Sequence, residues 1–381
     1  MNGFEWGGSE ELWWATAQYA HSEDHKVSIV AFRNDSIHEK FKTLERKGIK
    51  IFFVDKEREV ILPALIKRAY LKIGRRPVNI QYENRFDFIN QLKPDYILLS
   101  QGSTLDITYI EDLQFFFEKS ITPFSVICQH HSENGSVTKF QKDYIKPFFK
   151  KAQKVFFVAK RNKEVIERQL AYKLNNACVI KNPVNLIDKR IVPWPIISKP
   201  SFAVVARLQI DAKGQDILLQ ALSSEKWKQR DFTVNFFGTG SDLMLIKELI
   251  LFYGLDGKVN LKGHQRDIKK IWEENHLLLL ASLSEGTPLS QIEAMICGRP
   301  CLVTDVGDCA SYIEDNQNGW VVYTASVRAL DEALERAWIQ QNDWKEMGSK
   351  AHETVKEFIG YEAGACLFNA LLDDYVATVN T

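Results

Sequence analysis

The stretch from residue 283 to 305, LSEGTPLSQIEAMICGRPCLVTD, decides how we interpret this sequence. It predicts the end of a strand, a Gly/Pro turn, a short helix, a Gly-Arg-Pro break and a second buried strand. Glu285 and Glu293 are eight residues apart, slightly over two helical turns, so we expect both carboxylates on one face. Unpaired backbone N–H groups from Gly286 to Ser290 would form an anion site at the helix N-terminus. Carboxylates that hold hydroxyls beside amides that hold phosphates suit a sugar nucleotide.

Before this stretch, the first half of the chain alternates apolar runs with amphipathic ones. The apolar runs read as buried parallel strands. The amphipathic stretches 108–119 and 139–151 predict helices. Such alternation is typical of a doubly wound α/β domain, which binds ligands at the carboxyl ends of its strands. The predicted strands are residues 26–33, 49–55, 96–100, 124–129 and 154–159.

A proline-rich segment divides the chain into two parts. Residues 191–200, IVPWPIISKP, contain three prolines and no periodicity, so we predict an interdomain linker. We therefore expect a first domain at 1–190, a second α/β domain at 201–358 and a final amphipathic helix within 359–381. The strands predicted for the second domain are residues 201–206, 232–237, 258–263, 276–282 and 300–304.

The composition is that of a soluble globular protein, with 45% hydrophobic and 26% charged residues. No apolar run approaches the ~20 residues of a membrane-spanning helix, and we predict no signal peptide. The cysteines follow no metal-ligand spacing, and we expect free, mainly buried thiols in a cytoplasmic protein. They are Cys128, Cys178, Cys297, Cys301, Cys309 and Cys366.

Charge is unevenly distributed although the net charge is zero. Residues 1–190 carry 31 Lys and Arg against 23 Asp and Glu (+8), and residues 191–381 carry 18 against 26 (−8). One interpretation is that the basic half attracts an anionic acceptor or the inner membrane surface. The other is that opposite charges help the two domains face each other. The densest basic stretch contains Lys67, Arg68, Lys72, Arg75 and Arg76.

The opening stretch resembles the donor-site motif of retaining glycosyltransferases of family 4, which have the GT-B fold. The resemblance rests on EGTPLSQIEAM (285–295), the Gly-Arg-Pro at 298–300 and the strand ending in VTDVGD (303–308). It is strong from about residue 202 to 322 and weaker before that. It implies two Rossmann-like domains that face a cleft, with the C-terminal helix returning to the first domain.

The resemblance also assigns roles to residues of the second domain. It implies that Glu285 accepts hydrogen bonds from hydroxyls of the donor sugar and that Glu293 holds the ribose hydroxyls. Arg207 and Lys213, at a strand-to-helix turn, would neutralise the leaving diphosphate, so we expect no required metal or cofactor. The turn that borders sugar and phosphate would be Thr287, Pro288, Leu289 and Ser290.

A Gly-x-Gly turn follows another apolar run of the second domain. Gly238 and Gly240 would let the backbone approach a phosphate or base. Alone this pattern is weak, because it lacks the third glycine of a dinucleotide-binding fingerprint. Within the family pattern both glycines would border the nucleotide, and His264, at the next strand end, would line the base pocket.

In the first domain the resemblance points to a glycine loop and a strand end. Gly8 would approach the donor phosphate and the acceptor, in a loop that enters a helix capped by Ser9. Most relatives have a full apolar strand before this loop, but MNGFEW is a poor strand, so we expect the first strand to be missing. His130 and His131 follow the predicted strand 124–129; we favour His130 at the donor, but the sequence does not separate the two.

Four aromatic residues near the N-terminus leave two interpretations open. They stack on an acceptor sugar, or they belong to the core. They are Trp6, Trp13, Trp14 and Tyr19.

The sequence thus predicts a cytoplasmic glycosyltransferase that moves a hexose from a UDP- or GDP-sugar to a glycan or lipid-linked acceptor, with retention of configuration. We expect no nucleic-acid partner. Two alternatives are a GT-B sugar-nucleotide epimerase and a non-catalytic sugar-nucleotide-binding protein, the latter motivated by the missing strand.

Overall fold

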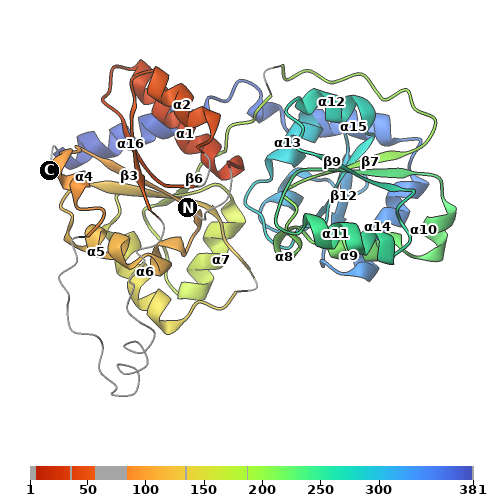
Figure 1. The fold of residues 1–381 in the computed structure, drawn as a ribbon, viewed down its shortest axis with the longest axis horizontal. Coiled ribbons are helices and arrows are strands. Elements are labelled where there is room, and N and C mark those ends of the chain that lie inside the picture. Colours follow the sequence, from red (N-terminus) through yellow and green to blue (C-terminus); the bar gives the residue numbers. More distant parts are fainter. Residues whose placement is uncertain (1–5, 35–36, 56–83, 134, 187, 380–381) are drawn as a thin grey trace.

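The computed structural model describes residues 6–34, 37–55, 84–133, 135–186 and 188–379. Figure 1 shows two halves, one formed by the early part of the chain (red to yellow) and one by the later part (green to blue), with the last helix lying on the first half. The basic stretch around Lys67 and Arg76, which carries the membrane hypothesis, lies outside the described residues. None of the described helices is long and apolar enough to cross a membrane.

The first half contains two parallel sheets. β1 (Ser28–Phe32) pairs with β2 (Lys50–Val54), and a separate sheet has the order β3-β4-β5-β6. Both sheets contribute to the same two apolar layers: Ile29 shares one layer with Ile127, and Phe32 shares the other with Val126. All five predicted strands are confirmed, and β6 is an additional short one. The strands of the larger sheet are β3 (Ile97–Ser103), β4 (Phe124–His130), β5 (Val155–Phe157) and β6 (Ala177–Val179).

Helices flank these sheets. The predicted helix at 139–151 is confirmed as α6 (Lys139–Lys151), with Thr138 accepting a hydrogen bond from the Gln141 N–H as its cap. The helix predicted at 108–119 is divided into η1 (Asp106–Tyr109) and α5 (Glu111–Lys119). The other helices of this half are α1 (Gly8–Ser22), α2 (Glu39–Arg46), α4 (Phe88–Gln91) and α7 (Lys160–Leu170).

The first described element is α1, and within the described residues no strand precedes it. The prediction that Ser9 caps this helix is wrong. The capping position is Gly7, whose N–H donates to Glu10 Oε2, and Ser9 lies inside the first turn, where its hydroxyl donates to the same carboxylate oxygen. Glu10, three residues after the cap, thus makes the reciprocal contact of a capping box, to the N–H of the cap residue itself.

One six-stranded parallel sheet forms the second half, in the order β12-β11-β10-β7-β8-β9. Alternate residues of β7 face opposite layers: Phe202 and Val204 pack with α9 and α14, whereas Ala203 packs with α13. The strand order reverses between β7 and β10, and doubly wound sheets bind their ligands at the carboxyl side of such a reversal. The five predicted strands are confirmed as β7 (Ser201–Val205), β8 (Thr233–Phe237), β9 (Val259–Gly263), β10 (Leu277–Leu280) and β11 (Cys301–Thr304), and β12 (Gly319–Val322) is additional.

Helices lie on both faces of this sheet (Figure 1). They are α8 (Ile210–Lys213), α9 (Gln215–Leu222), α10 (Glu225–Gln229), α11 (Leu243–Phe252), α12 (Ile268–Glu274), α13 (Leu289–Ile296), η2 (Cys309–Tyr312), α14 (Val327–Ile339), α15 (Trp344–Thr354) and η3 (Lys356–Phe358).

The segment predicted as the linker, 191–200, contains no helix or strand. Its start is held by Arg299, whose side chain is fully buried and donates to the carbonyl oxygens of Val192 and Pro193. The same guanidinium also donates to the carbonyls of Trp272 and Asn275. A buried cation without a carboxylate is thus satisfied by backbone oxygens, and it ties the segment to the second half.

The chain returns to the first half through α16 (Ala363–Val379), which packs against α1 (Figure 1). Leu367 is buried beside Leu12 and Ala17, and the Phe368 ring contacts the Tyr19 ring edge-on. The returning chain runs close to the outgoing one, since the Lys189 ammonium donates to the Phe358 carbonyl at 2.9 Å. This confirms the expected return of the C-terminal helix.

The aromatic cluster at the N-terminus is divided between core and surface. Trp13 is buried, and its ring lies 5.3 Å from that of Trp6 and 5.8 Å from that of Phe41. Trp6 and Trp14 are half-buried, with the Lys40 ammonium 4.3 Å from the Trp14 ring centroid. Trp13 and Tyr19 therefore pack within the fold. All six cysteines are free, and Cys366 is the exposed one.

Candidate functional site

An ion pair lies at the carboxyl ends of β7 and β10. Lys213 ends α8, which follows β7, and Glu285 follows β10; the Lys213 ammonium lies 2.6 Å from Glu285 Oε1. The Ser282 hydroxyl donates to the same oxygen at 2.7 Å. Both charged side chains are only partly exposed, at 20% and 10%. The sequence predicted both charged residues but not that they touch each other or that Ser282 joins them.

The structure separates the two neighbouring histidines. The backbone just before His130 meets the loop of Glu285, since a Cβ atom on Gly286 would lie 2.2 Å from the Gln129 carbonyl oxygen. The charges of Lys213 and Glu285 both act on His130 across this boundary. Burial lowers the pKa of His130; the negative charges of Asp106 and Glu285 oppose this shift, and Lys213 reinforces it. His130 is therefore a neutral imidazole at neutral pH.

His131 lies in a different environment. It is buried, and its Nε2 makes a 2.8 Å hydrogen bond with the Gln169 side chain of α7. Burial lowers the pKa of His131 as well. Its contacts are those of a packing residue of the first half, so the geometry favours His130 as the histidine at the donor.

Glu293 lies on α13, two turns beyond Glu285, and its carboxyl group is buried. Burial raises the pKa of Glu293 to about 8, against a hydrogen bond from the Asn185 backbone N–H. Without a ligand, this carboxyl group is therefore largely protonated at neutral pH. A ligand that donates hydrogen bonds to it would favour its ionised form.

The N-terminal loop of the first half lies against both elements of this site. A Cβ atom on Gly7 would be 3.0 Å from Arg207 Nη2, and one on Gly8 would be 3.2 Å from Leu289 Cδ1. Arg207 comes two residues after β7 and Leu289 begins α13. Gly8 thus lies beside the first residue of the predicted phosphate-binding helix end, and a Cβ atom there would press on the Leu289 side chain.

The turn before α13 connects the two halves directly. Thr287 donates its hydroxyl hydrogen to the Val158 carbonyl at 2.7 Å. A Cβ atom on Gly286 would lie 2.2 Å from the Gln129 carbonyl oxygen, so only glycine fits there. The Thr287 side chain is engaged with protein, which leaves the first backbone N–H groups of α13, including those of Leu289 and Ser290, for a ligand.

The remaining predicted residues follow the neighbouring strands β8 and β9. A Cβ atom on Gly238 would be 2.0 Å from the Ala206 carbonyl oxygen, and one on Gly240 would be 2.1 Å from the Leu208 carbonyl oxygen. Both glycines are therefore needed for the packing of two turns, whatever they contribute to a ligand. His264 is exposed and directly follows β9, the edge strand.

A second set of contacts, which the sequence did not predict, joins the halves beside the site. The Asp308 carboxylate accepts hydrogen bonds from the Lys160 N–H (2.9 Å) and the Arg161 N–H (3.1 Å) at the N-terminus of α7. The Arg161 guanidinium is paired with Glu133 of its own half and Asp305 of the other. We refer to two contacts together as the interdomain clasp: the hydrogen bonds of Asp308 with the start of α7, and the ion pair of Arg161 with Asp305.

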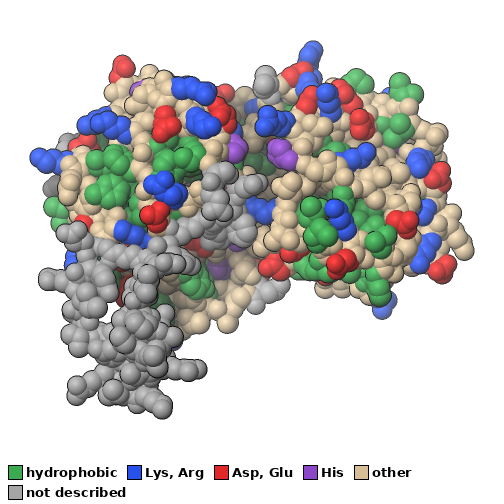
Figure 2. All heavy atoms as spheres, viewed as in Figure 1, with side chains coloured by type: hydrophobic (Ala, Val, Ile, Leu, Met, Phe, Trp, Pro, Cys, Tyr) green, Lys and Arg blue, Asp and Glu red, His purple; other side chains and the backbone are tan. Residues whose placement is uncertain are grey.

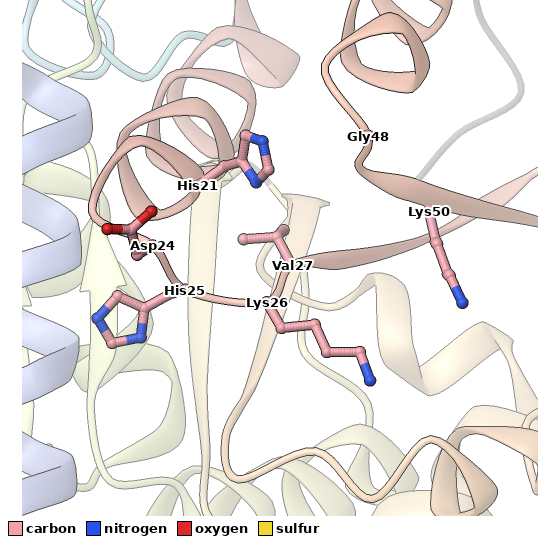
Figure 3. A pocket seen from close by; sticks show the side chains of 7 residues that line it. All are labelled: His21, Asp24, His25, Lys26, Val27, Gly48 and Lys50. Carbon is pink, nitrogen blue, oxygen red and sulfur yellow. The ribbon is translucent and has the colours of Figure 1, made fainter.

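The side chains around this boundary can be followed on the surface. Figure 2 shows His side chains on both sides of the notch between the halves. Away from it, a pocket of ≈ 330 Å³ lies at the amino ends of β1 and β2, lined among others by His21, Lys26 and Lys50 (Figure 3). The two lysine ammonium groups extend away from the ring of His21 in that view. This pocket is at the opposite end of the strands from the candidate site.

The family model described as glycosyl transferases group 1 matches residues 194–354. The second half of the chain therefore matches this family model, and the match does not extend into the first half. The matched range contains four charged residues of the candidate site: Arg207, Lys213, Glu285 and Glu293.

Two curated relatives are named as N-acetylglucosaminyltransferases. The chain is 26% identical over 72% of its length to the UDP-N-acetylglucosamine–peptide N-acetylglucosaminyltransferase GtfA subunit of Streptococcus pneumoniae, of which it covers 56%. It is 27% identical over 63% of its length to the poly(ribitol-phosphate) alpha-N-acetylglucosaminyltransferase of Staphylococcus aureus, of which it covers 48%. The chain thus spans about half the length of these relatives.

Solved structures support the fold over nearly the whole chain. A point mutant of S. aureus TarM, in complex with fondaparinux, alpha-GlcNAc-glycerol and UDP, aligns with a TM-score of 0.71 at 16% identity and 98% coverage of both chains. Anabaena Alr3699/HepE in complex with UDP and glucose aligns with a TM-score of 0.71 at 14% identity and 97% coverage of both. The chain therefore has the GT-B fold.

Proposed function

We propose that this chain is a glycosyltransferase that uses a UDP-sugar and transfers the sugar, with retention, to a hydroxyl of a glycan or lipid-linked acceptor. The observation that carries the proposal is the Lys213–Glu285 ion pair beside His130, within the range matched by the group 1 model. The choice of UDP over GDP is supported by the relative named for UDP-N-acetylglucosamine and by the neighbours solved with UDP.

In this proposal the donor lies between α13 and the turn after β7. The N–H groups at the start of α13, Arg207 and Lys213 bind the diphosphate, and their charge stabilises the leaving group as the bond breaks. Glu293 accepts hydrogen bonds from the ribose, and Glu285 from the transferred sugar. We predict that these roles need no metal or cofactor.

The reaction itself is a front-face substitution. The bond between the anomeric carbon and the diphosphate oxygen breaks, and the acceptor oxygen bonds to the same face of that carbon. The leaving phosphate oxygen takes the acceptor proton, so no carboxylate acts as nucleophile. His130, neutral and at a strand end, is placed to donate a hydrogen bond to a sugar hydroxyl.

A screen of UDP-, GDP- and ADP-sugars for transfer and hydrolysis tests this function. We expect turnover with a UDP-sugar, and we expect Glu285→Gln to lower it by roughly 10- to 150-fold, the range for hydrogen bonds to a charged group. Glu248→Gln, the same change on the exposed part of α11, is the control and should leave turnover unchanged. Wild-type rates in Glu285→Gln would remove the assignment.

Tight binding of UDP-sugars without transfer or hydrolysis would instead favour a non-catalytic sugar-nucleotide-binding protein. One observation favours this non-catalytic alternative. The first half is divided into two sheets, β1-β2 and β3-β4-β5-β6, and no strand precedes α1 among the described residues. Conversion of the donor without an acceptor would favour an epimerase.

A further inference from the structure

We infer that Ser282 is a positioning residue that fixes the carboxylate of Glu285 toward the donor sugar. This inference rests on the proposed function and deepens it at one atom. Ser282 lies just after β10, is fully buried, and donates its hydroxyl hydrogen to Glu285 Oε1 at 2.7 Å. Nothing in the donor chemistry itself requires a serine here.

Two donors share the same oxygen of Glu285, and they differ in what else they must do. The Lys213 ammonium lies 2.6 Å from Oε1. Its proposed task is to neutralise the leaving diphosphate, so a bound donor competes with Glu285 for this cation. The Ser282 hydroxyl is fully buried and does not bind the diphosphate in this proposal, so a bound donor does not compete with Glu285 for it.

Ser282 is itself held in place from the neighbouring strand. Thr304, at the end of β11, donates its hydroxyl hydrogen to the Ser282 carbonyl at 2.6 Å. The next residues of the loop are fixed as well, since the N–H groups of Leu283 and Ser284 donate to the Ala212 carbonyl. The hydroxyl of Ser282 therefore approaches Oε1 from a rigid frame.

The consequence concerns the second carboxylate oxygen. When Lys213 turns toward the diphosphate, a carboxylate held by no other donor is free to rotate about its last torsion, which has a broad energy minimum. The hydrogen bond from Ser282 keeps Oε1 fixed, so Oε2 continues to face the sugar. Preorganised acceptors of this kind contribute to catalysis because they need no reorientation during the reaction.

The test compares Ser282→Ala with Ser284→Ala in the full chain, with UDP-N-acetylglucosamine as donor and UDP alone as nucleotide. The Ser284 hydroxyl is buried without a hydrogen-bond partner in the described part of the chain, so it is a matched control in the same loop. We expect Ser282→Ala to lower kcat/KM for the donor about tenfold to a hundredfold, the effect of one hydrogen bond to a charged group. Binding of UDP alone should change less than about twofold, because UDP makes no contact with Glu285 in this proposal. Ser282→Thr, which keeps the hydroxyl, should recover most of the loss.

Wild-type kcat/KM in Ser282→Ala would overturn the inference. So would a parallel loss of UDP affinity, which indicates a general structural fault, or an equal loss in Ser284→Ala. If the wild-type protein neither binds nor turns over a sugar nucleotide, the proposed function fails. Crystal structures of Lys213→Met and of the double variant Lys213→Met/Ser282→Ala, both without ligand, then decide the positioning role alone, because Lys213 no longer holds the carboxylate: a Glu285 carboxylate in one unchanged orientation in both would refute it.

Discussion

Replacing Asp308 with alanine removes the carboxylate of the second half that accepts hydrogen bonds from the N-terminus of α7 in the first half. In the native arrangement the Asp308 carboxylate accepts hydrogen bonds from the Lys160 and Arg161 backbone N–H groups, at the positive end of α7. Asp308 is buried, and its carboxylate loses these two N–H groups when the halves separate. The substitution should therefore raise the free energy of the closed arrangement and leave the open one nearly unchanged.

The size of the effect follows from two hydrogen bonds and one helix end. Each backbone hydrogen bond contributes about 1 kcal/mol, and a carboxylate at a helix N-terminus adds roughly 0.3–1 kcal/mol. Burial raises the pKa of Asp308, so the cost of desolvating the carboxylate offsets part of this gain. We therefore expect a net loss of about 2 kcal/mol, which shifts the closed-to-open ratio by roughly 30-fold.

Single-molecule energy transfer between dyes on the two halves measures this ratio, with and without UDP. We expect more of the open form in Asp308→Ala and a weaker apparent affinity for UDP, since ligand binding then has to supply the energy of closure. Asp256→Ala, an exposed turn position in the second half, serves as control. An unchanged distance distribution and unchanged affinity in Asp308→Ala would mean that the clasp does not hold the halves together.

Three further outcomes are expected. Arg299→Met removes the donor that six backbone carbonyls share. We expect it to lower the free energy of unfolding of the second half by about 4 kcal/mol, measured by urea unfolding followed by tryptophan fluorescence. A loss below about 1 kcal/mol would contradict this account. Because burial holds the pKa of Glu293 at about 8 in the free protein, UDP binding near pH 7 should release a proton and strengthen as the pH rises toward 8. Calorimetry in buffers of different ionisation enthalpy measures this release, and Glu293→Gln should abolish it. Gly286→Ala would place a Cβ atom 2.2 Å from the Gln129 carbonyl oxygen and should weaken closure as Asp308→Ala does, whereas an unaffected closure would show that the backbone adapts.

The sequence was a good guide to the strands and to the residues of the second half. The apolar runs of β7, β8, β10 and β11 are buried on both faces, so their composition is nearly continuous and easy to interpret. The strands that it missed are short: β6 has three residues and β12 has four. Length alone does not explain these misses, because β5, β10 and β11 are as short and were predicted. β6 is only partly buried, so its composition gives a weaker signal.

Contacts between the halves could not be predicted from the sequence. Arg161 and Asp305 are 144 positions apart, and no local pattern relates them. Even Ser282, three residues before Glu285, looks like an ordinary small residue at a strand end, and only its distance to Oε1 gives it a role. His130 and His131 illustrate the same limit, because His130 ends β4 and His131 lies just beyond it, and only their contacts distinguish the two.

The return of α16 to the first half has a consequence for the order in which the protein can fold during synthesis. Leu12 and Ala17 of α1 are made before the second half, yet the side chain that packs with them, Leu367, emerges from the ribosome after the entire second half. The second half can therefore complete its core while the first is still waiting for its last helix. During that interval the apolar face of α1 stays exposed, and a chaperone that recognises such faces has its best opportunity to bind there.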